Sequence, residues 1–508
     1  MSISYLSHKI NSQIASRWIC IFLLGLLLWG GLLRFYHLSD QSYWMDEGYT
    51  INAVLSVTEH GSTILDSGQN YPCLTYCYPT ALLTKIFGGS PTVYRLFSAI
   101  IGLAFIILIF FITKRLFNRK AALLSSFLIT FSYLQIAWSR QARFYTLFLF
   151  VFWLALYFFY KFLYSDKNKY SNFSLTLIFT LLASFTYPLG YLLFFIFLGW
   201  ILIDQIFIQK KFNWKKILIV FLVEIIILLI TTILTGINLL TLFPVKPQLF
   251  YILPYYLSFY LRTYWLFMPL VILAFFKKDN PYKKEITFLL FVLGLYLIFF
   301  SFFTNIVNYR YLFHLTPIIF ILGSIGFLNI LDDIKFRFGK VSFGLIIFSL
   351  FVLTNGVFIP QSHYYLEADD QSKLASRPYY VYTPQPNWTK AYNFIKENKK
   401  EKDLIISSQP VFNKIFLKEA GYWIKYNYLG LKTKNDYLDQ EYYVGAKVIN
   451  NLSELQTLTI ANHGFIIFDY MSIQSRISED ILNYIQKNLT LIFQEETNSY
   501  SKIWIYKF

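Results

Sequence analysis

Long apolar segments separated by short basic clusters run through the first 360 residues of this chain. Of its 508 residues, 56% are hydrophobic and only 14% are charged. A soluble domain cannot bury so many apolar side chains, whereas a bilayer accepts apolar helices of about 20 residues. The pattern predicts a polytopic α-helical membrane protein with about eleven spans. We place them at 18–33, 93–113, 121–138, 145–164, 175–187, 189–208, 217–234, 255–276, 286–303, 311–330 and 341–359.

The positions of Lys and Arg predict the orientation of these spans. Basic clusters follow alternate spans, for example at 114–120 and 209–216, and such clusters favour the cytoplasmic side. We therefore expect a multi-pass plasma-membrane protein with a cytoplasmic amino terminus. The same clusters account for the net charge of +17, so nucleic acid is not an expected partner. At Tyr187-Pro188 one kinked helix could replace two, which would reverse every later span.

The composition divides the chain into two predicted domains. Residues 1–360 form the transmembrane domain, with a large first outer loop at about 35–92 whose helices lie at the membrane interface. Residues 361–508 have the composition of a soluble domain. Apolar strands at 403–407, 464–469, 490–493 and 502–506, with helices after Asn387 and at 478–488, predict an extracytoplasmic α/β domain.

Two adjacent carboxylates, Asp46 and Glu47, follow the first span directly. Charges so close to a bilayer are costly unless they lie in water or in a polar cleft, so the pair is a candidate functional site. Alternatively, Asp46 could be the N-cap of a helix that begins near Glu47. The residues alone leave both interpretations open.

Three other features have mainly structural interpretations. Cys20, Cys73 and Cys77 do not have the spacing of a zinc site. Cys73 and Cys77 are one helical turn apart, which favours two neighbouring thiols, and a disulfide there requires an irregular backbone. Glu224 lies inside an apolar run, where a structural partner is favoured over a role in transport or catalysis.

Several short motifs follow one another in order from the first to the tenth span. They are Trp44-Met45-Asp46-Glu47-Gly48-Tyr49, Tyr71-Pro72, Phe87-Gly88-Gly89-Ser90, Tyr94-Arg95-Leu96-Phe97-Ser98-Ala99, Ser139-Arg140-Gln141-Ala142-Arg143-Phe144-Tyr145 and Tyr309-Arg310-Tyr311. With these motifs the chain resembles the GT-C superfamily of membrane glycosyltransferases, which includes aminoarabinose transferases, protein mannosyltransferases and RgtA/B/C/D-like enzymes. These enzymes take a sugar from a polyprenyl-phosphate carrier.

The resemblance implies a GT-C-like fold and an inverting hexosyl- or pentosyltransferase of the cell envelope. The donor is a polyprenyl-phosphate sugar, and the acceptor is a lipid, a glycan or a protein. Asp46 is the implied general base, and Glu47 assists it, binds acceptor or caps the helix. The side chains that would contact the donor phosphate are Arg140, Arg143 and Arg310, followed by Lys85, Arg95, Arg262 and Tyr71.

The chain departs from the family pattern at two positions. Gln141 occupies a position that is often acidic and can help to bind a divalent metal, so the resemblance leaves metal dependence open. Tyr71 replaces a basic residue or His before Pro72. For Arg140 and Arg143, contact with lipid headgroups is the alternative role.

Two other functions stay open. A polytopic transporter or lipid-glycan flippase would use Glu224 and the arginines along a path. A third hypothesis is a binding module on a degenerate enzyme.

Overall fold

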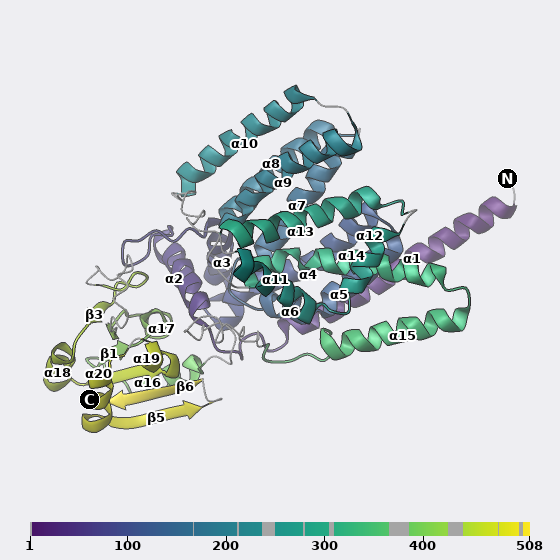
Figure 1. The fold of residues 1–508 in the computed structure, drawn as a ribbon. Helices are drawn as coiled ribbons and strands as arrows, with labels where there is room; N and C mark the ends of the chain where they lie inside the picture. Colours follow the sequence, from purple (N-terminus) through teal and green to yellow (C-terminus); the bar gives the residue numbers. More distant parts are fainter. Residues whose placement is uncertain are drawn as a thin grey trace. The chain divides into compact units, whose positions relative to one another are not determined.

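The computed structural model describes residues 3–165, 167–210, 213–235, 249–277, 280–303, 309–364, 386–424, 440–475, 477–496 and 501–508. The chain divides into two units, each drawn in Figure 1. The first, called the membrane unit, contains residues 1–36, 98–140 and 144–361. The second, called the site unit, contains residues 37–97, 141–143 and 362–508. The first outer loop thus belongs to the same unit as the carboxyl-terminal segment.

Helices make up the described part of the membrane unit. Seven of them are long and apolar enough to cross a membrane within the described residues, or eight if one bent pair counts as one span. The expected number of about eleven spans is therefore not confirmed. The helices are α1 Ile3–Phe35, α4 Pro91–Leu116 (from residue 98), α5 Arg119–Phe131, α6 Tyr133–Ser139, α7 Tyr145–Tyr164, α8 Lys169–Thr186, η1 Pro188–Tyr191, α9 Leu192–Ile203, η2 Asp204–Ile208, α10 Trp214–Thr235, α11 Leu249–Thr263, α12 Met268–Phe276, α13 Lys283–Phe303, η4 Tyr309–Leu315, α14 Thr316–Asp333 and α15 Arg337–Thr354.

One expected span, at 121–138, is broken into α5 and α6. Ser132 has an extended backbone with ψ of 125° between the two helices. The backbone groups on either side of the break form hydrogen bonds with the segment after α15. Val357 N donates to Phe131 O at 2.8 Å, and Tyr133 N donates to Asn355 O at 3.0 Å. The prediction of a continuous helix was wrong because these long-range bonds replace the helical ones.

The expected span at 255–276 is also broken. Its two parts, within α11 and α12, meet at an angle of 99°. Pro269 lies in the first turn of α12, where a missing N–H costs nothing and a new helix readily begins. At Tyr187 the chain likewise forms two helices, because α8 ends at Thr186 and α9 begins at Leu192. The backbone of α10 is described, but the side chain of Glu224 lies outside the described residues.

The first outer loop contains two helices, α2 Met45–His60 and α3 Leu74–Phe87. Every residue of helix α2 from 50 to 57 is buried. Helix α3 instead exposes an apolar stripe at spacing four, a pattern typical of a helix at a membrane interface. The stripe consists of Leu74, Tyr78, Leu82 and Ile86, with Phe87 beside it.

The carboxyl-terminal segment forms one six-stranded sheet in the order β3-β2-β1-β4-β6-β5. The first four of these strands are parallel, and β6 is antiparallel to β4. Strands β5 and β6 are also antiparallel, and their arrows point in opposite directions in Figure 1. The expected strands and the helices after Asn387 and at 478–488 are present. The elements are α16 Trp388–Asn398, β1 Leu404–Ser407, α17 Pro410–Leu417, β2 Tyr422–Ile424, β3 Lys447–Ile449, α18 Leu452–Ala461, β4 Gly464–Asp469, α19 Tyr470–Ser475, α20 Glu479–Asn488, β5 Thr490–Glu496 and β6 Lys502–Lys507.

Helix α17 packs directly on helix α2. A Cβ at Gly48 would lie 3.1 Å from Val411 Cγ2 and 3.2 Å from Phe412 Cε1, so the absent side chain permits this close approach. Asn52 Nδ2 donates to Val411 O at 3.1 Å and to Gly48 O at 2.9 Å. Contacts of this kind hold the α/β segment against the helix that carries Asp46.

Candidate active site around Asp46

Asp46 and Glu47 lie in the first turn of helix α2. The helix begins at Met45 and its N-cap is Trp44, so Asp46 is not the cap that the sequence also allowed. A carboxylate in the first turn is nevertheless favoured by the positive end of the helix dipole. Because neighbouring helical residues point in different directions, the two carboxylates have different surroundings.

Glu47 is 1% exposed and pairs with Arg95, which is 2% exposed. Arg95 Nε donates to Glu47 Oε1 at 2.8 Å and Arg95 Nη2 donates to Glu47 Oε2 at 2.9 Å. The same guanidinium donates to the carbonyls of Leu38 and Gln41, at 2.9 and 2.8 Å. Glu47 also accepts from the backbone N–H of Ala142 at 2.8 Å. This ion pair therefore ties the loop before α2 and the 141–143 loop to one helix.

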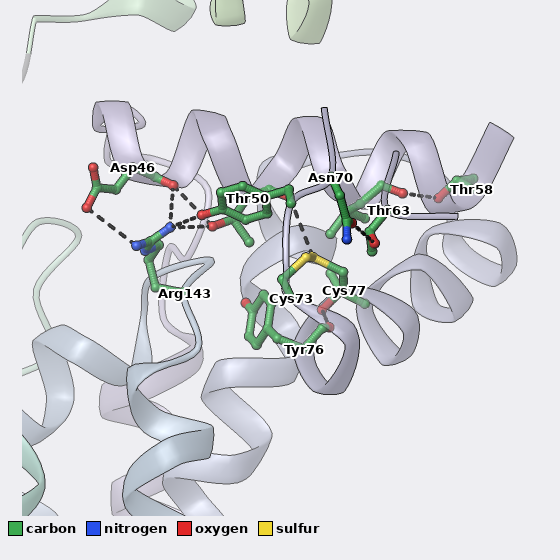
Figure 2. The surroundings of a disulfide bond; sticks show 12 residues. Asp46, Thr50, Thr58, Thr63, Asn70, Cys73, Tyr76, Cys77 and Arg143 are labelled. Atoms are coloured by element: carbon green, nitrogen blue, oxygen red, sulfur yellow. Dashed lines mark hydrogen bonds and ion pairs between the residues drawn. A yellow bond between two sulfur atoms is a disulfide. The ribbon is translucent and has the colours of Figure 1, made fainter. Parts of the chain in front are cut away.

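Asp46 is more accessible, with 24% of its side chain exposed, and Arg143 lies beside it. Arg143 Nη2 is 3.5 Å from Asp46 Oδ2, and Arg143 Nη1 donates to Asp46 O at 3.0 Å. Arg143 Nη1 also donates to Thr50 Oγ1 at 2.7 Å, as Figure 2 shows. Several fixed acceptors thus hold the guanidinium at the edge of the carboxylate.

Tyr71 joins the same group through its hydroxyl, which accepts from Arg143 Nη1 at 2.9 Å. Just after Tyr71, a disulfide joins Cys73 to Cys77, whose Cα atoms are 5.4 Å apart (Figure 2). Cys73 precedes helix α3 and has a non-helical backbone, with φ of −133° and ψ of 32°. The prediction of two free thiols, which the spacing favoured, was wrong, because the irregular backbone at Cys73 brings the two sulfur atoms together.

An aromatic cluster borders the carboxylate. The ring of Tyr49 stacks on Tyr443 with 3.7 Å between centroids, and Tyr71 meets Tyr443 edge to face at 6.0 Å. Burial raises the pKa of the Tyr443 hydroxyl, and the nearby Tyr49, Tyr71 and Asp46 raise it further. Tyr443 comes from the carboxyl-terminal segment.

The structure brings five expected residues together in the site unit: Asp46, Glu47, Tyr71, Arg95 and Arg143. It also places there three residues that were not expected. Thr50 has a signal in the sequence, because it lies one helical turn after Asp46. Tyr443 and the Ala142 N–H have none, since only the fold brings them to α2.

The other four predicted phosphate ligands are distributed over both units. Lys85 is exposed in the last turn of α3. In the membrane unit, Arg140 is 3% exposed and its Nη1 donates to the carbonyls of Leu33, Arg34 and Tyr36 at the end of α1. Arg310 Nη2 donates to Tyr311 OH at 3.1 Å. Arg262 is exposed in α11. Their predicted contacts with a donor phosphate remain predictions.

The described residues do not assemble a ligand set for a metal ion. No group of three or more His, Cys, Asp or Glu side chains among them could hold one. The Oε1 atom of Gln141 is buried without a hydrogen-bond partner in the described part, but one neutral amide oxygen does not make a site for a hard divalent cation. We therefore assign no step to a metal, and metal dependence stays open.

Comparisons with known proteins point to one fold. The family model described as dolichyl-phosphate-mannose-protein mannosyltransferase matches residues 72–234. The structure of ArnT from Cupriavidus metallidurans bound to undecaprenyl phosphate aligns with a TM-score of 0.59 at 12% identity, over 97% of this chain and 98% of that one. The apo ArnT structure aligns with a TM-score of 0.61 at 13% identity, with the same coverage of both chains.

The chain has the fold of ArnT, the GT-C fold. The archaeal oligosaccharyltransferase AglB from Archaeoglobus fulgidus, in complex with an inhibitory peptide and a dolichol-phosphate, shares this GT-C fold. It aligns with a TM-score of 0.58 at 12% identity, over 96% of this chain and 74% of that one. No curated protein matches by sequence. The expected fold class, a helical membrane protein with an α/β segment at the carboxyl end, is confirmed.

Proposed function

We propose that this protein is a glycosyltransferase that moves a sugar from a polyprenyl-phosphate donor to an acceptor hydroxyl or amine. The GT-C fold, the family match and the lipid phosphates named with ArnT and AglB support this class. The observation that carries the proposal is the geometry at α2, where the partly exposed Asp46 lies beside a guanidinium held by Thr50 and Tyr71.

In the proposed step, the acceptor oxygen or nitrogen attacks the anomeric carbon while the bond from that carbon to the phosphate oxygen breaks. The acceptor proton passes to the Asp46 carboxylate, and the electron pair leaves with the polyprenyl phosphate. Attack from the face opposite the phosphate inverts the anomeric centre. Arg143 Nη2 lies 3.5 Å from Asp46 Oδ2, and its guanidinium would stabilise the departing anion.

We further propose that the reaction occurs on the extracytoplasmic face of the plasma membrane. The Cys73–Cys77 disulfide supports this side, because such bonds persist in oxidising compartments and are rare in the cytosol. The loop that contains the disulfide also contains Tyr71, so the site and the disulfide share one side. Labelling of an introduced cysteine at Asp40 with an impermeant reagent in intact cells tests this orientation.

The test of the function is consumption of a lipid-linked sugar by purified protein. An Asp46→Asn variant should lose about 10² to 10⁴ in rate, the usual contribution of a general base. Asp40→Asn is the matched control, because Asp40 lies in the same loop, is exposed and pairs with His37. Full turnover by Asp46→Asn would remove the mechanism, and loss in both variants would point to a folding defect.

A transporter or flippase remains the second candidate, favoured by the 99° break between α11 and α12. It predicts movement of lipid-linked sugar across vesicles that contain the protein, without cleavage of the sugar from its phosphate. Sugar release in the purified assay would exclude transport as the only activity.

A further inference from the structure

Besides helix α17, a short loop of the carboxyl-terminal segment contacts the candidate site: residues 440–447, which we call the tyrosine loop. Glu441 organises it: its Oε2 atom accepts from the N–H groups of Tyr443 and Val444 at 2.8 and 2.7 Å. Glu441 N donates to Ala446 O at 2.8 Å, and Gly445 N donates to Glu441 O at 3.0 Å. These bonds fix the conformation from which the Tyr443 ring projects.

The tyrosine loop is attached to the loop that carries Tyr71. Ser67 Oγ donates to the carbonyl of Tyr442. A Cβ at Gly445 would lie 3.5 Å from Ser67 Cα, so the two backbones are in contact. Gly445 also has φ of +70°, a conformation that favours glycine. Tyr443 therefore has a defined place over α2.

From that place Tyr443 contacts two residues of the site. Its ring stacks on Tyr49 at an interplanar angle of 11°, and it meets Tyr71 at 64°. Tyr71 in turn accepts the hydrogen bond from Arg143 that lies beside Asp46. Arg143 is a long side chain with many rotamers, so its position depends on the groups that surround it. The contacts form a continuous series from Tyr443 through Tyr71 to Arg143 and Asp46.

We propose that Tyr443 is a positioning residue for glycosyl transfer, by which the α/β segment holds Tyr71 and Arg143 in register with Asp46. The inference rests on the proposed function. Its consequence is that the carboxyl-terminal segment is part of the catalytic machinery and not a separate binding module. A displacement of about 1 Å at a catalytic group can cost about 10²-fold in rate, so loss of the ring should be visible in kcat.

The test compares Tyr443→Leu, which keeps bulk without the ring, with Tyr443→Phe, which keeps the ring without the hydroxyl. We expect Tyr443→Leu to lower kcat for lipid-linked sugar consumption about tenfold to hundredfold, with a smaller change in KM. Tyr443→Phe should stay within about twofold of the wild type, because ring contacts carry the positioning. The matched control is Phe493→Leu on β5. It removes a ring whose centroid lies 5.0 Å from that of Phe394 on α16.

A double variant separates positioning from general stability. If Tyr443 acts through Tyr71, the two substitutions should not be independent. The double variant Tyr443→Leu with Tyr71→Phe should then have a smaller fold-loss in kcat than the product of the fold-losses of the two single variants. Amide hydrogen exchange in segments 45–50 and 66–73 should be faster in Tyr443→Leu and unchanged in Phe493→Leu. This second readout needs no turnover.

Three results would overturn the inference: a kcat for Tyr443→Leu equal to that of the wild type, an equal loss in Phe493→Leu, or unchanged exchange in both segments. Absence of turnover by the wild-type protein with every lipid-linked sugar would instead refute the proposed function, and the catalytic role of Tyr443 with it. The two failures are therefore distinguishable by the wild-type measurement alone.

Discussion

Two adjacent carboxylates can have different tasks when a helix points them in different directions. Glu47 is fully buried and bonded to Arg95 and to the Ala142 N–H, whereas Asp46 keeps about a quarter of its side chain exposed. Because both oxygens of the buried Glu47 carboxylate accept hydrogen bonds, this residue is suited to holding the two loops together. The Asp46 carboxylate is partly exposed and therefore more accessible to a substrate, which is why we propose it as the base.

The Glu47–Arg95 pair gives the first prediction. Glu47→Gln should destabilise the protein by about 3 to 5 kcal/mol, because the Arg95 charge would stay buried without its partner. Thermal unfolding in detergent measures this effect. Adding Arg95→Met to Glu47→Gln should recover part of the loss. If Glu47→Gln unfolds at the wild-type temperature, the ion pair does not hold the loops.

Arg143 gives a second prediction at the same scale. Arg143→Lys keeps the charge but loses the planar guanidinium, which contacts Thr50, Tyr71 and Asp46 at once. Turnover should therefore fall about 10²-fold. Arg119→Lys, at an exposed position in the first turn of α5, is the control. Steady-state consumption of the lipid-linked sugar is the measurement, and equal rates in both variants would exclude a specific role for the guanidinium.

At the scale of elements, the site depends on a loop that is closed at both ends. Tyr71 N donates to Thr63 O at 3.0 Å, and the disulfide closes the loop at the start of α3. The Sγ atom of Cys77 also lies 4.0 Å from the Thr50 carbonyl oxygen on α2. These contacts restrict the position of the Tyr71 hydroxyl.

Opening this disulfide should therefore reduce activity. A disulfide that closes so short a loop stabilises by about 2 kcal/mol in the chain-entropy model. We expect Cys73→Ser combined with Cys77→Ser to lower turnover severalfold and to remove any further effect of reductant. Cys20→Ser is the control, since Cys20 is an exposed free cysteine. Reductant that inhibits the double variant as strongly as the wild type would contradict this role.

The broken elements show the same dependence on distant partners. Helices α5 and α6 separate at Ser132 because Asn355 and Val357 supply hydrogen bonds to the residues on either side. Hydropathy predicts one helix at 121–138, since an apolar composition does not distinguish a continuous helix from two short ones. The break is decided by a segment more than 200 residues later in the chain.

At the scale of the whole molecule, the carboxyl-terminal segment is anchored to the first outer loop by charge as well as by packing. Lys414 Nζ lies 2.8 Å from Asp66 Oδ2 and 3.6 Å from Glu59 Oε2. Burial lowers the pKa of Lys414, but the hydrogen bond and charge of Asp66, with Glu59, more than offset this and raise it above its ordinary value.

A raised pKa means that this contribution to stability is complete below the ordinary lysine pKa and is lost only as the pH rises through the folded value. Lys414→Gln should lower the free energy of unfolding by about 1 kcal/mol at neutral pH. The difference from the wild type should disappear in strongly alkaline solution. Unfolding curves across that range measure it, with Lys487→Gln on α20 as control. A difference that grows with pH would contradict this sign.

The sequence by itself determined the membrane class, the presence of helices in the first outer loop, and the strands of the α/β segment, because periodicity and apolar length are local properties. It also identified Asp46, Arg143 and Tyr71 as candidates. Only the tertiary structure decided that Glu47 forms an ion pair with Arg95, that Cys73 and Cys77 form a disulfide, and that Tyr443 borders the site. Those facts depend on contacts between residues far apart in the chain, and no local pattern encodes which distant side chain will complete a hydrogen bond or cover a ring.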